Sequence, residues 1–169
     1  RTKKFKISLV PQIGGFFSDL STEDNLNAVG EILIQDTKNR KMKIEELISK
    51  FELDAVRKVE AKFLSGGMKR RLVISMSLLG EPEILLMDEP LAALDPQTIQ
   101  MLQTIIIKLQ SEYNLTILIT DHQARDLLVV CDKAVILSNS KIVAEGTPNE
   151  LMKNENATKY YFGDNFKFK

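Results

Sequence analysis

The sequence predicts an α/β fold in which a mostly parallel sheet is flanked by helices and a small helical subdomain is inserted. Two observations favour this fold class. Short, continuous apolar runs such as Ile84–Met87 and Thr116–Ile119 are typical of strands buried on both faces of a parallel sheet. Segments with apolar residues at helical spacing separate these runs, and strands that alternate with helices favour parallel pairing.

The first part of the chain predicts one strand and two helices. Ile7–Val10 is an apolar run ended by a proline, as expected for a short strand. Ser21–Asp24 has the form of a capping box and predicts a helix to about Ile34. We expect a turn or loop over Gln35–Arg40. A second helix then carries apolar residues at Ile44, Leu47, Ile48 and Phe51.

The middle of the chain predicts two further helices, which lie before and after the strand Ile84–Met87. Ser65 is a good N-cap for a helix that ends near Gly80. The apolar face of this helix consists of Leu72, Val73, Met76 and Leu79. Asp95 followed by proline is typical of an N-cap with proline at the first helical position, and this helix is expected to run to about Ser111.

The last part of the chain predicts a short helix, a hairpin and a final helix. The helix is expected from about Gln123 to Val130, and the strand Ala134–Leu137 follows it. Asn139-Ser140 predicts a turn into a second strand, Lys141–Ala144, so that a hairpin forms at the sheet edge. Thr147–Glu150 predicts another capping box.

Composition excludes several classes of function. Lys and Arg total 23 and Asp and Glu total 23, so the formal net charge is zero and we expect no nucleic-acid partner. Cys131 is the only cysteine, which excludes an intrachain disulfide, and His122 is the only histidine, which argues against a zinc site. No apolar run approaches the ~18 residues of a membrane span, so no direct membrane insertion is expected.

Three polar segments could carry chemistry, and each has an ordinary alternative. Asp88-Glu89 follows a strand and could bind Mg²⁺ and activate water, or could be a solvated acidic turn. Ser65-Gly66-Gly67 could receive a phosphate at a helix N-terminus, or could simply start a helix. His122 could approach a phosphate or be a surface histidine, and Gln12 is uninformative by itself.

The order of these segments is far more specific than any one of them. Gln12, Leu64–Gly67, Asp88–Pro90, Ala93–Asp95 and His122 together resemble the motifs of ABC-type ATPases, the nucleotide-binding subunits of ATP-driven transporters. The resemblance covers nearly the whole chain. It implies a P-loop-NTPase-like fold, ATP and Mg²⁺ as ligands, and a homodimer formed with a second copy of the ATPase.

The resemblance also implies a role for each motif residue. Gln12 is similar to the Q-loop glutamine, which senses Mg²⁺ and the attacking water. Asp88 is implied to be the Walker B aspartate that binds Mg²⁺, partly through water, and Glu89 the general base. His122 is similar to the switch histidine. With Gln12 and Glu89, it completes the implied catalytic set.

The remaining implied nucleotide contacts act across the dimer. Ser65, Gly66 and Gly67 resemble the signature motif, which contacts the γ-phosphate of ATP held by the opposite protomer. Met68 stands where many members of the family have Gln. Asp95 belongs to a segment that resembles the D-loop and is also implied to contact nucleotide.

Other segments are similar to the ATPases of lipopolysaccharide exporters. These segments are Thr120–Asp126, Gly146–Pro148, Tyr161–Phe166 and Gly15–Ser21. The similarity implies that Phe17, beside Leu20 and Leu26, lines a groove for the coupling helices of transmembrane permease subunits. It also implies a cytoplasmic protein held peripherally on the inner face of the bacterial inner membrane. ATPases of branched-chain amino-acid importers are the related alternative.

The motifs divide the expected chain into four segments. Residues 1–21 end the first core lobe with the Q-loop, and residues 22–64 form a helical subdomain that leads to the signature motif. Residues 65–146 form a RecA-like core, and residues 147–169 a C-terminal helix and tail.

The sequence departs from the family pattern because it contains no G-x-x-x-x-G-K-[ST] motif. We therefore expect the phosphate-cradling loop to precede residue 1, so that the first part of the core is missing. The 169-residue chain alone is then expected to bind no MgATP and to be inactive. A degenerate docking module without hydrolysis remains an alternative. A DNA-repair ATPase is disfavoured because residues 22–60 are too short for the long coiled coil of that class.

Overall fold

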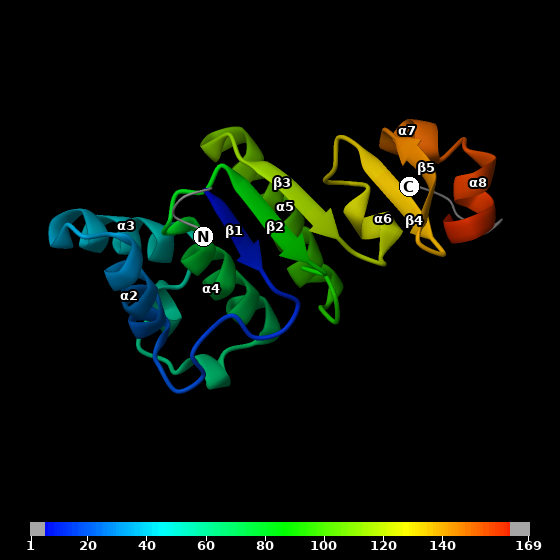
Figure 1. The fold of residues 1–169 in the computed structure, drawn as a ribbon. Coiled ribbons are helices and arrows are strands. Elements are labelled where there is room, and N and C mark those ends of the chain that lie inside the picture. Colours follow the sequence, from blue (N-terminus) through cyan, green and yellow to red (C-terminus); the bar gives the residue numbers. More distant parts are fainter. Residues whose placement is uncertain (1–5, 163–169) are drawn as a thin grey trace. The chain divides into compact units, whose positions relative to one another are not determined.

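The computed structural model describes residues 6–162, and the chain divides into two compact units between Asp121 and His122 (Figure 1). The first unit contains a three-stranded parallel sheet in the order β1-β2-β3. Its strands are β1 (Ile7–Val10), β2 (Ile84–Asp88) and β3 (Thr116–Thr120). The predicted α/β class with parallel pairing is confirmed.

The predicted burial of the strands on both faces is wrong for one face of this sheet. Strand side chains alternate between the two faces, and in β2 Leu85 and Met87 are buried while their neighbours are partly exposed. Leu9, Leu86 and Leu118 are in register across the three strands. Leu118 is 62% exposed. Only one face of this short sheet is therefore fully packed within the described residues.

The α-helices of the first unit begin where a side chain accepts a hydrogen bond from one of their first N–H groups. The helices are α2 (Thr22–Leu33), α3 (Thr37–Lys50), η1 (Asp54–Val56), η2 (Ala61–Phe63), α4 (Gly66–Leu78) and α5 (Pro96–Tyr113). Ser21, Ser65 and Asp95 cap α2, α4 and α5 as predicted. The expected loop over 35–40 is too long, because Asp36 accepts a 2.7 Å hydrogen bond from Asn39 and starts α3 earlier.

The inserted helices pack on the unit through α2 and α4. α2 contacts α3 on one side and α4 on the other, and α4 packs against β1. Leu26, Leu47 and Ile48 are fully buried in this part of the core. The helix that follows Ser65 is thus held between the inserted segment and the sheet.

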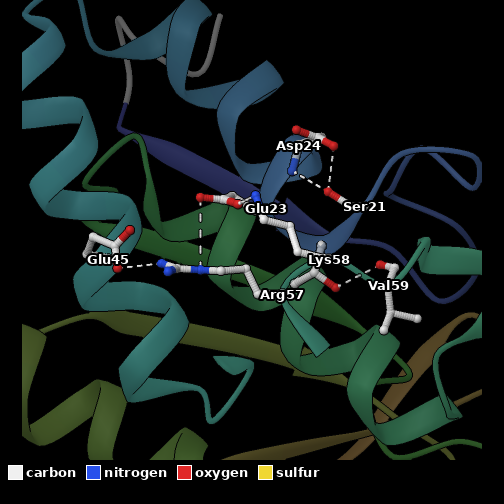
Figure 2. A network of polar contacts seen from close by, with 8 residues as sticks. Ser21, Glu23, Asp24, Glu45, Arg57, Lys58 and Val59 are labelled. Carbon is white, nitrogen blue, oxygen red and sulfur yellow. Dashed lines mark hydrogen bonds and ion pairs between the residues drawn. The ribbon is translucent and has the colours of Figure 1, made fainter. Parts of the chain in front are cut away.

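A polar network joins the start of α2 to the chain that precedes α4 (Figure 2). Arg57 lies between Glu23 and Glu45, with its Nε 3.9 Å from Glu23 Oε1 and its guanidinium paired with Glu45. Lys58 is also paired with Glu23. Partly exposed ion pairs contribute about 0–1 kcal/mol each. Their main effect is to fix how α2, α3 and the segment before the next helix lie together.

The second unit, which begins at His122, has its own small core. It contains α6 (Ala124–Leu127), β4 (Ala134–Ser138), β5 (Lys141–Gly146), α7 (Pro148–Leu151), α8 (Glu155–Ala157) and a π-helical turn, η3 (Thr158–Phe162). Its buried residues are Leu128, Ile136, Ala144, Leu151 and Ala157.

The predicted hairpin is confirmed, with Asn139 and Ser140 both at positive φ (48° and 59°). Within the described residues it forms a separate two-stranded sheet and does not extend the first one. The helix expected over 123–130 is shorter, and the capping box at Thr147 is present. Most of the tail segment Tyr161–Phe166, from residue 163 on, lies outside the described residues. Between residues 6 and 162 the helices are too short or too polar to span a bilayer.

Candidate nucleotide-hydrolysis site

The loops that follow the three parallel strands meet at one edge of the first unit. Gln12 lies two residues after β1, while Asp88 and Thr120 end β2 and β3. The Gln12 amide Nε2 donates a 2.7 Å hydrogen bond to Glu89 Oε2. The Thr120 hydroxyl donates a 2.6 Å hydrogen bond to Asp88 Oδ1. The structure therefore brings Gln12, Asp88 and Glu89 together, at the sheet edge where ligands bind in open α/β folds.

Glu89 adopts a backbone conformation that few residues other than glycine adopt. Its φ is 41°, in the left-handed region, and its N–H donates a 2.8 Å hydrogen bond to the Thr120 carbonyl. A non-glycine residue in this region costs on the order of 1–3 kcal/mol, and such strain clusters at functional sites. The turn continues the pairing with β3 for one residue and directs the Glu89 carboxylate toward Gln12.

Arg70 connects the loop after β1 to the turn after β2, a role that the sequence analysis did not predict. From α4, its Nη1 donates to the Pro11 carbonyl at 2.8 Å, and its Nη2 donates to the Gln12 carbonyl at 3.1 Å and the Glu89 carbonyl at 3.4 Å. Burial lowers the pKa of Arg70, and the carboxylate of Asp121 opposes this effect. No local pattern could reveal this role, because the three carbonyls come from segments 19 to 59 residues away.

Asp121 holds the chain that follows Glu89. One of its carboxylate oxygens accepts a 3.3 Å hydrogen bond from the N–H of Leu91, which is fully buried. Asp121 ends the first unit, and the exposed His122 begins the second. The predicted role of His122 as a switch residue stays a prediction.

Ser65, Gly66 and Gly67 form the N-terminus of α4, and Gly67 is packed tightly. Ser65 accepts a 3.3 Å hydrogen bond from the Met68 N–H. A Cβ on Gly67 would lie 2.7 Å from the methyl carbon of Thr98 in α5. The sequence indicated these glycines for their exposed N–H groups, but the structure adds close helix packing as a second reason for Gly67.

Asp95 and Thr98 form the other side of that contact. The Thr98 hydroxyl donates a 2.5 Å hydrogen bond to Asp95 Oδ2, and the Thr98 N–H donates to Asp95 Oδ1 at 3.0 Å. These hydrogen bonds from Thr98 lower the pKa of Asp95. The carboxylate is exposed and charged at neutral pH, but its hydrogen bonds are those of a helix cap. A direct nucleotide contact from Asp95 stays a prediction.

Phe17 lies in a surface loop that a buried asparagine holds in place. Phe17 is 52% exposed, so it is not a core residue. Asn25 is fully buried; its Oδ1 accepts from the Phe17 N–H at 2.7 Å, and its Nδ2 donates to the Phe17 carbonyl at 3.0 Å. Leu20 is 37% exposed, whereas Leu26 is completely buried, so the expectation that Leu26 lines the same groove is wrong. Leu26 lies on the inner side of α2, within the core.

The donor set at the sheet edge suits Mg²⁺ held together with phosphate. Asp88 is an exposed carboxylate, and the Gln12 amide that donates through its nitrogen retains its oxygen as a possible ligand. Among the described residues there is no cluster of three or more His, Cys, Asp or Glu that could hold a metal ion by itself. Such a site fits Mg²⁺, which binds through one or two carboxylates, water and substrate phosphates.

Comparisons with known proteins identify the family of the chain. A family model described as "ABC transporter" matches residues 1–92. The chain is 38% identical over 162 residues to the lipopolysaccharide export system ATP-binding protein LptB of Haemophilus influenzae, and 36% identical to LptB of Escherichia coli strain K12. Both alignments cover 95% of this chain and 67% of the relative. An ABC transporter ATP-binding protein of Rhizobium meliloti is 34% identical, with 98% of this chain and 61% of the relative covered.

Solved structures show the same fold at lower identity. CbiO1 of Clostridium perfringens, described as part of the ABC transporter complex CbiONQ, has a TM-score of 0.81 at 22% identity. The match covers 92% of this chain and 62% of that one. An ATP-binding cassette of an ABC transporter in its ADP conformation has a TM-score of 0.79 at 21% identity, with 96% and 70% covered. The chain thus spans about two thirds of the length of the proteins it matches.

Proposed function

The chain belongs to the ABC transporter family as an ATP-binding subunit close to LptB, and from this premise we propose that it forms the hydrolytic part of a transport ATPase. The observation that carries the proposal is the 2.7 Å hydrogen bond from Gln12 to Glu89, two residues 77 positions apart. A solvated acidic turn would not require this pairing. A docking module that does not hydrolyse ATP would have no use for it.

The roles of the site residues follow from their chemistry. The Glu89 carboxylate accepts a proton from the attacking water, and the Gln12 amide holds one oxygen of that carboxylate in a defined direction. Asp88, oriented by the Thr120 hydroxyl, offers its second oxygen to the hydration shell of Mg²⁺. Mg²⁺, which Asp88 and Gln12 would help to hold, would supply the positive charge that neutralises the phosphates of ATP in the transition state.

The N-terminus of α4 supplies the second half of the proposed site, in trans. Ser65 and the N–H groups of Gly66 and Gly67 lie at the positive end of a 13-residue helix, where an anion is stabilised. We propose that they contact the γ-phosphate of ATP on a second copy of the chain. Nucleotide-dependent dimerisation is then expected, because each copy completes the site of the other.

Replacement of Glu89 by glutamine tests the hydrolytic proposal in the intact protein. Glu89→Gln preserves shape and removes the base, so MgATP binding should persist while turnover falls by ~10²–10⁴-fold. Sizing chromatography with ATP should then show a trapped dimer. Glu83→Gln, at the residue just before β2 and in an exposed pair with Lys6, is the matched control and should retain turnover. Near wild-type hydrolysis by Glu89→Gln would refute the assignment.

We propose lipopolysaccharide export as the transport process, since two relatives at 36–38% identity carry that name. An importer of branched-chain amino acids is the alternative from the sequence. The protein would be purified with its membrane subunits, which mass spectrometry would identify. Its ATPase activity would then be measured with lipopolysaccharide and with leucine. Export permeases and stimulation by lipopolysaccharide alone are expected, whereas importer permeases and stimulation through amino-acid binding would refute this cargo.

The permease partner is proposed to dock beside Phe17, at the cytoplasmic face of the membrane. An exposed ring on a loop anchored by a buried asparagine is suited to receive a short helix through a few apolar contacts. Phe17→Ala should reduce co-purification with the membrane subunits and leave the melting temperature nearly unchanged. Ile107→Ala, which removes a similarly exposed apolar residue on α5, is the control. Unchanged co-purification of Phe17→Ala would contradict this docking site.

A further inference from the structure

Arg70 makes a set of contacts that the proposed chemistry does not explain. Arg70 lies on α4 one turn after the glycines and is partly buried. Its hydrogen bonds all go to backbone carbonyls, those of Pro11, Gln12 and Glu89. A planar fork with several fixed donors can hold carbonyls from separate segments at once, which a lysine ammonium cannot do in the same geometry.

Two of the three carbonyls that Arg70 holds belong to the residues whose side chains meet in the site. Gln12 and Glu89 are joined by their side chains at 2.7 Å, and Arg70 joins the same two residues through their backbones. Glu89 is also in the strained left-handed conformation, which persists only where surrounding contacts over-determine it. Arg70 supplies one of those contacts.

The position of Arg70 on α4 adds a connection to the N-terminus of that helix, one turn away. Ser65 to Gly67 form its first turn, and a helix transmits a displacement of its N-terminus along its axis as a rigid element. We propose that Arg70 is a positioning residue, which sets the placement of Gln12 and Glu89 and couples it to α4. This inference rests on the proposed hydrolytic function, in which Arg70 would align the general base Glu89.

The first experiment separates positioning from binding in the intact protein. Arg70→Met should lower kcat by about 10- to 100-fold, the effect of a small misplacement of reacting groups. KM for ATP should change by less than about threefold, because Arg70 makes no contact with nucleotide in this proposal. Arg70→Lys, which can reach one carbonyl, should fall between wild type and Arg70→Met. Lys69→Met, the neighbouring cation on α4, is the control and should keep wild-type kcat.

Two further readouts distinguish positioning from a general loss of structure. In the Glu89→Gln background the base is already absent, so adding Arg70→Met should reduce single-turnover hydrolysis less than about twofold. If Arg70 had a purely structural role, Arg70→Met would instead reduce the hydrolysis rate by the same factor in the wild-type and Glu89→Gln backgrounds. Hydrogen exchange should be faster for amides of residues 12–16 and 89–93 in Arg70→Met, with the protection of α2 and α3 unchanged.

The outcomes separate the two proposals. If Glu89→Gln keeps full turnover, the hydrolytic function itself is wrong. If Glu89→Gln is inactive while Arg70→Met retains kcat within twofold, or shows equal losses in both backgrounds, the positioning role alone is wrong. If kcat falls with little change in KM, the loss is small in the Glu89→Gln background and exchange rises only in the two loops, the inference is supported.

Discussion

Replacement of Gly67 by alanine should destabilise the protein, whereas the same change at Gly66 should not. The added Cβ at Gly67 would lie 2.7 Å from the Thr98 methyl carbon, about 1 Å inside the optimal separation of two carbons. Thr98 cannot rotate away freely, because its hydroxyl is hydrogen-bonded to Asp95 at 2.5 Å. The clash must therefore move α4 against α5 or break the cap of α5.

The expected magnitude follows from two opposing effects. Overpacking of this kind costs about 1–3 kcal/mol, and alanine offsets up to about 1 kcal/mol through its higher helix propensity. The net loss for Gly67→Ala then lies between about 0 and 3 kcal/mol, and the middle of that range, about 1–2 kcal/mol, is several degrees of melting temperature at ~2–4 °C per kcal/mol. At Gly66 the new Cβ would lie 3.3 Å from the end of the Leu94 side chain, which can move aside. Gly66→Ala should be neutral or slightly stabilising.

Thermal and urea unfolding of both variants would measure the difference. Thr98→Ser removes the offending methyl group and keeps the hydroxyl that donates to the capping carboxylate of Asp95, so it provides a rescue. The double variant Gly67→Ala/Thr98→Ser should recover most of the stability lost in Gly67→Ala. If Gly67→Ala is as stable as Gly66→Ala, or if Thr98→Ser gives no rescue, the packing argument is wrong.

Three other outcomes are expected. Asn25→Ala removes buried hydrogen bonds to the loop that carries Phe17. It should lower the free energy of unfolding by about 1–3 kcal/mol and speed amide hydrogen exchange at Phe17, and an unchanged urea midpoint would contradict this. The pKa of the Cys131 thiol is raised, chiefly by burial and also by the negative charge of Asp132. The fraction of thiolate at pH 8 is therefore smaller in the folded protein than in the unfolded chain. The midpoint of its alkylation rate against pH should lie higher in the folded protein, and equal midpoints would refute the assignment. The 169-residue chain alone should show no melting shift with millimolar MgATP, whereas a ligand at 100 times its Kd would stabilise by ~2.7 kcal/mol.

Several features of this protein are local and could be predicted from sequence. Ser21, Ser65 and Asp95 start helices because their side chains accept N–H groups three residues ahead, an interaction complete within one turn. Asn139 and Ser140 form the hairpin turn for a similar reason, since their own backbone conformation determines it. The placement of Asp88 and Glu89 at the end of a strand could be predicted because an apolar run is followed directly by two acidic residues.

The extent of strand burial could not be read from the sequence. A continuous apolar run indicates that both faces avoid water, but only packing decides what covers each face. Leu9 and Leu118 are apolar and yet more than half exposed within the described chain. The sequence likewise could not show that Leu26 is buried in the core, although the nearby Phe17 is exposed.

The sequence by itself determined the fold class, the starts of α2, α4 and α5, and the order of the motifs. Apolar runs, helix caps and motifs are each recognised from residues a few positions apart, and their order is read directly from the chain. Only the tertiary structure decided the Gln12–Glu89 pairing, the three carbonyls on Arg70, the anchoring of Phe17 by Asn25 and the close contact of Gly67 with Thr98. Most of these interactions join separate elements, up to 77 residues apart. Their geometry depends on how helices pack on a sheet to within a fraction of an ångström, which no pattern of residue types specifies.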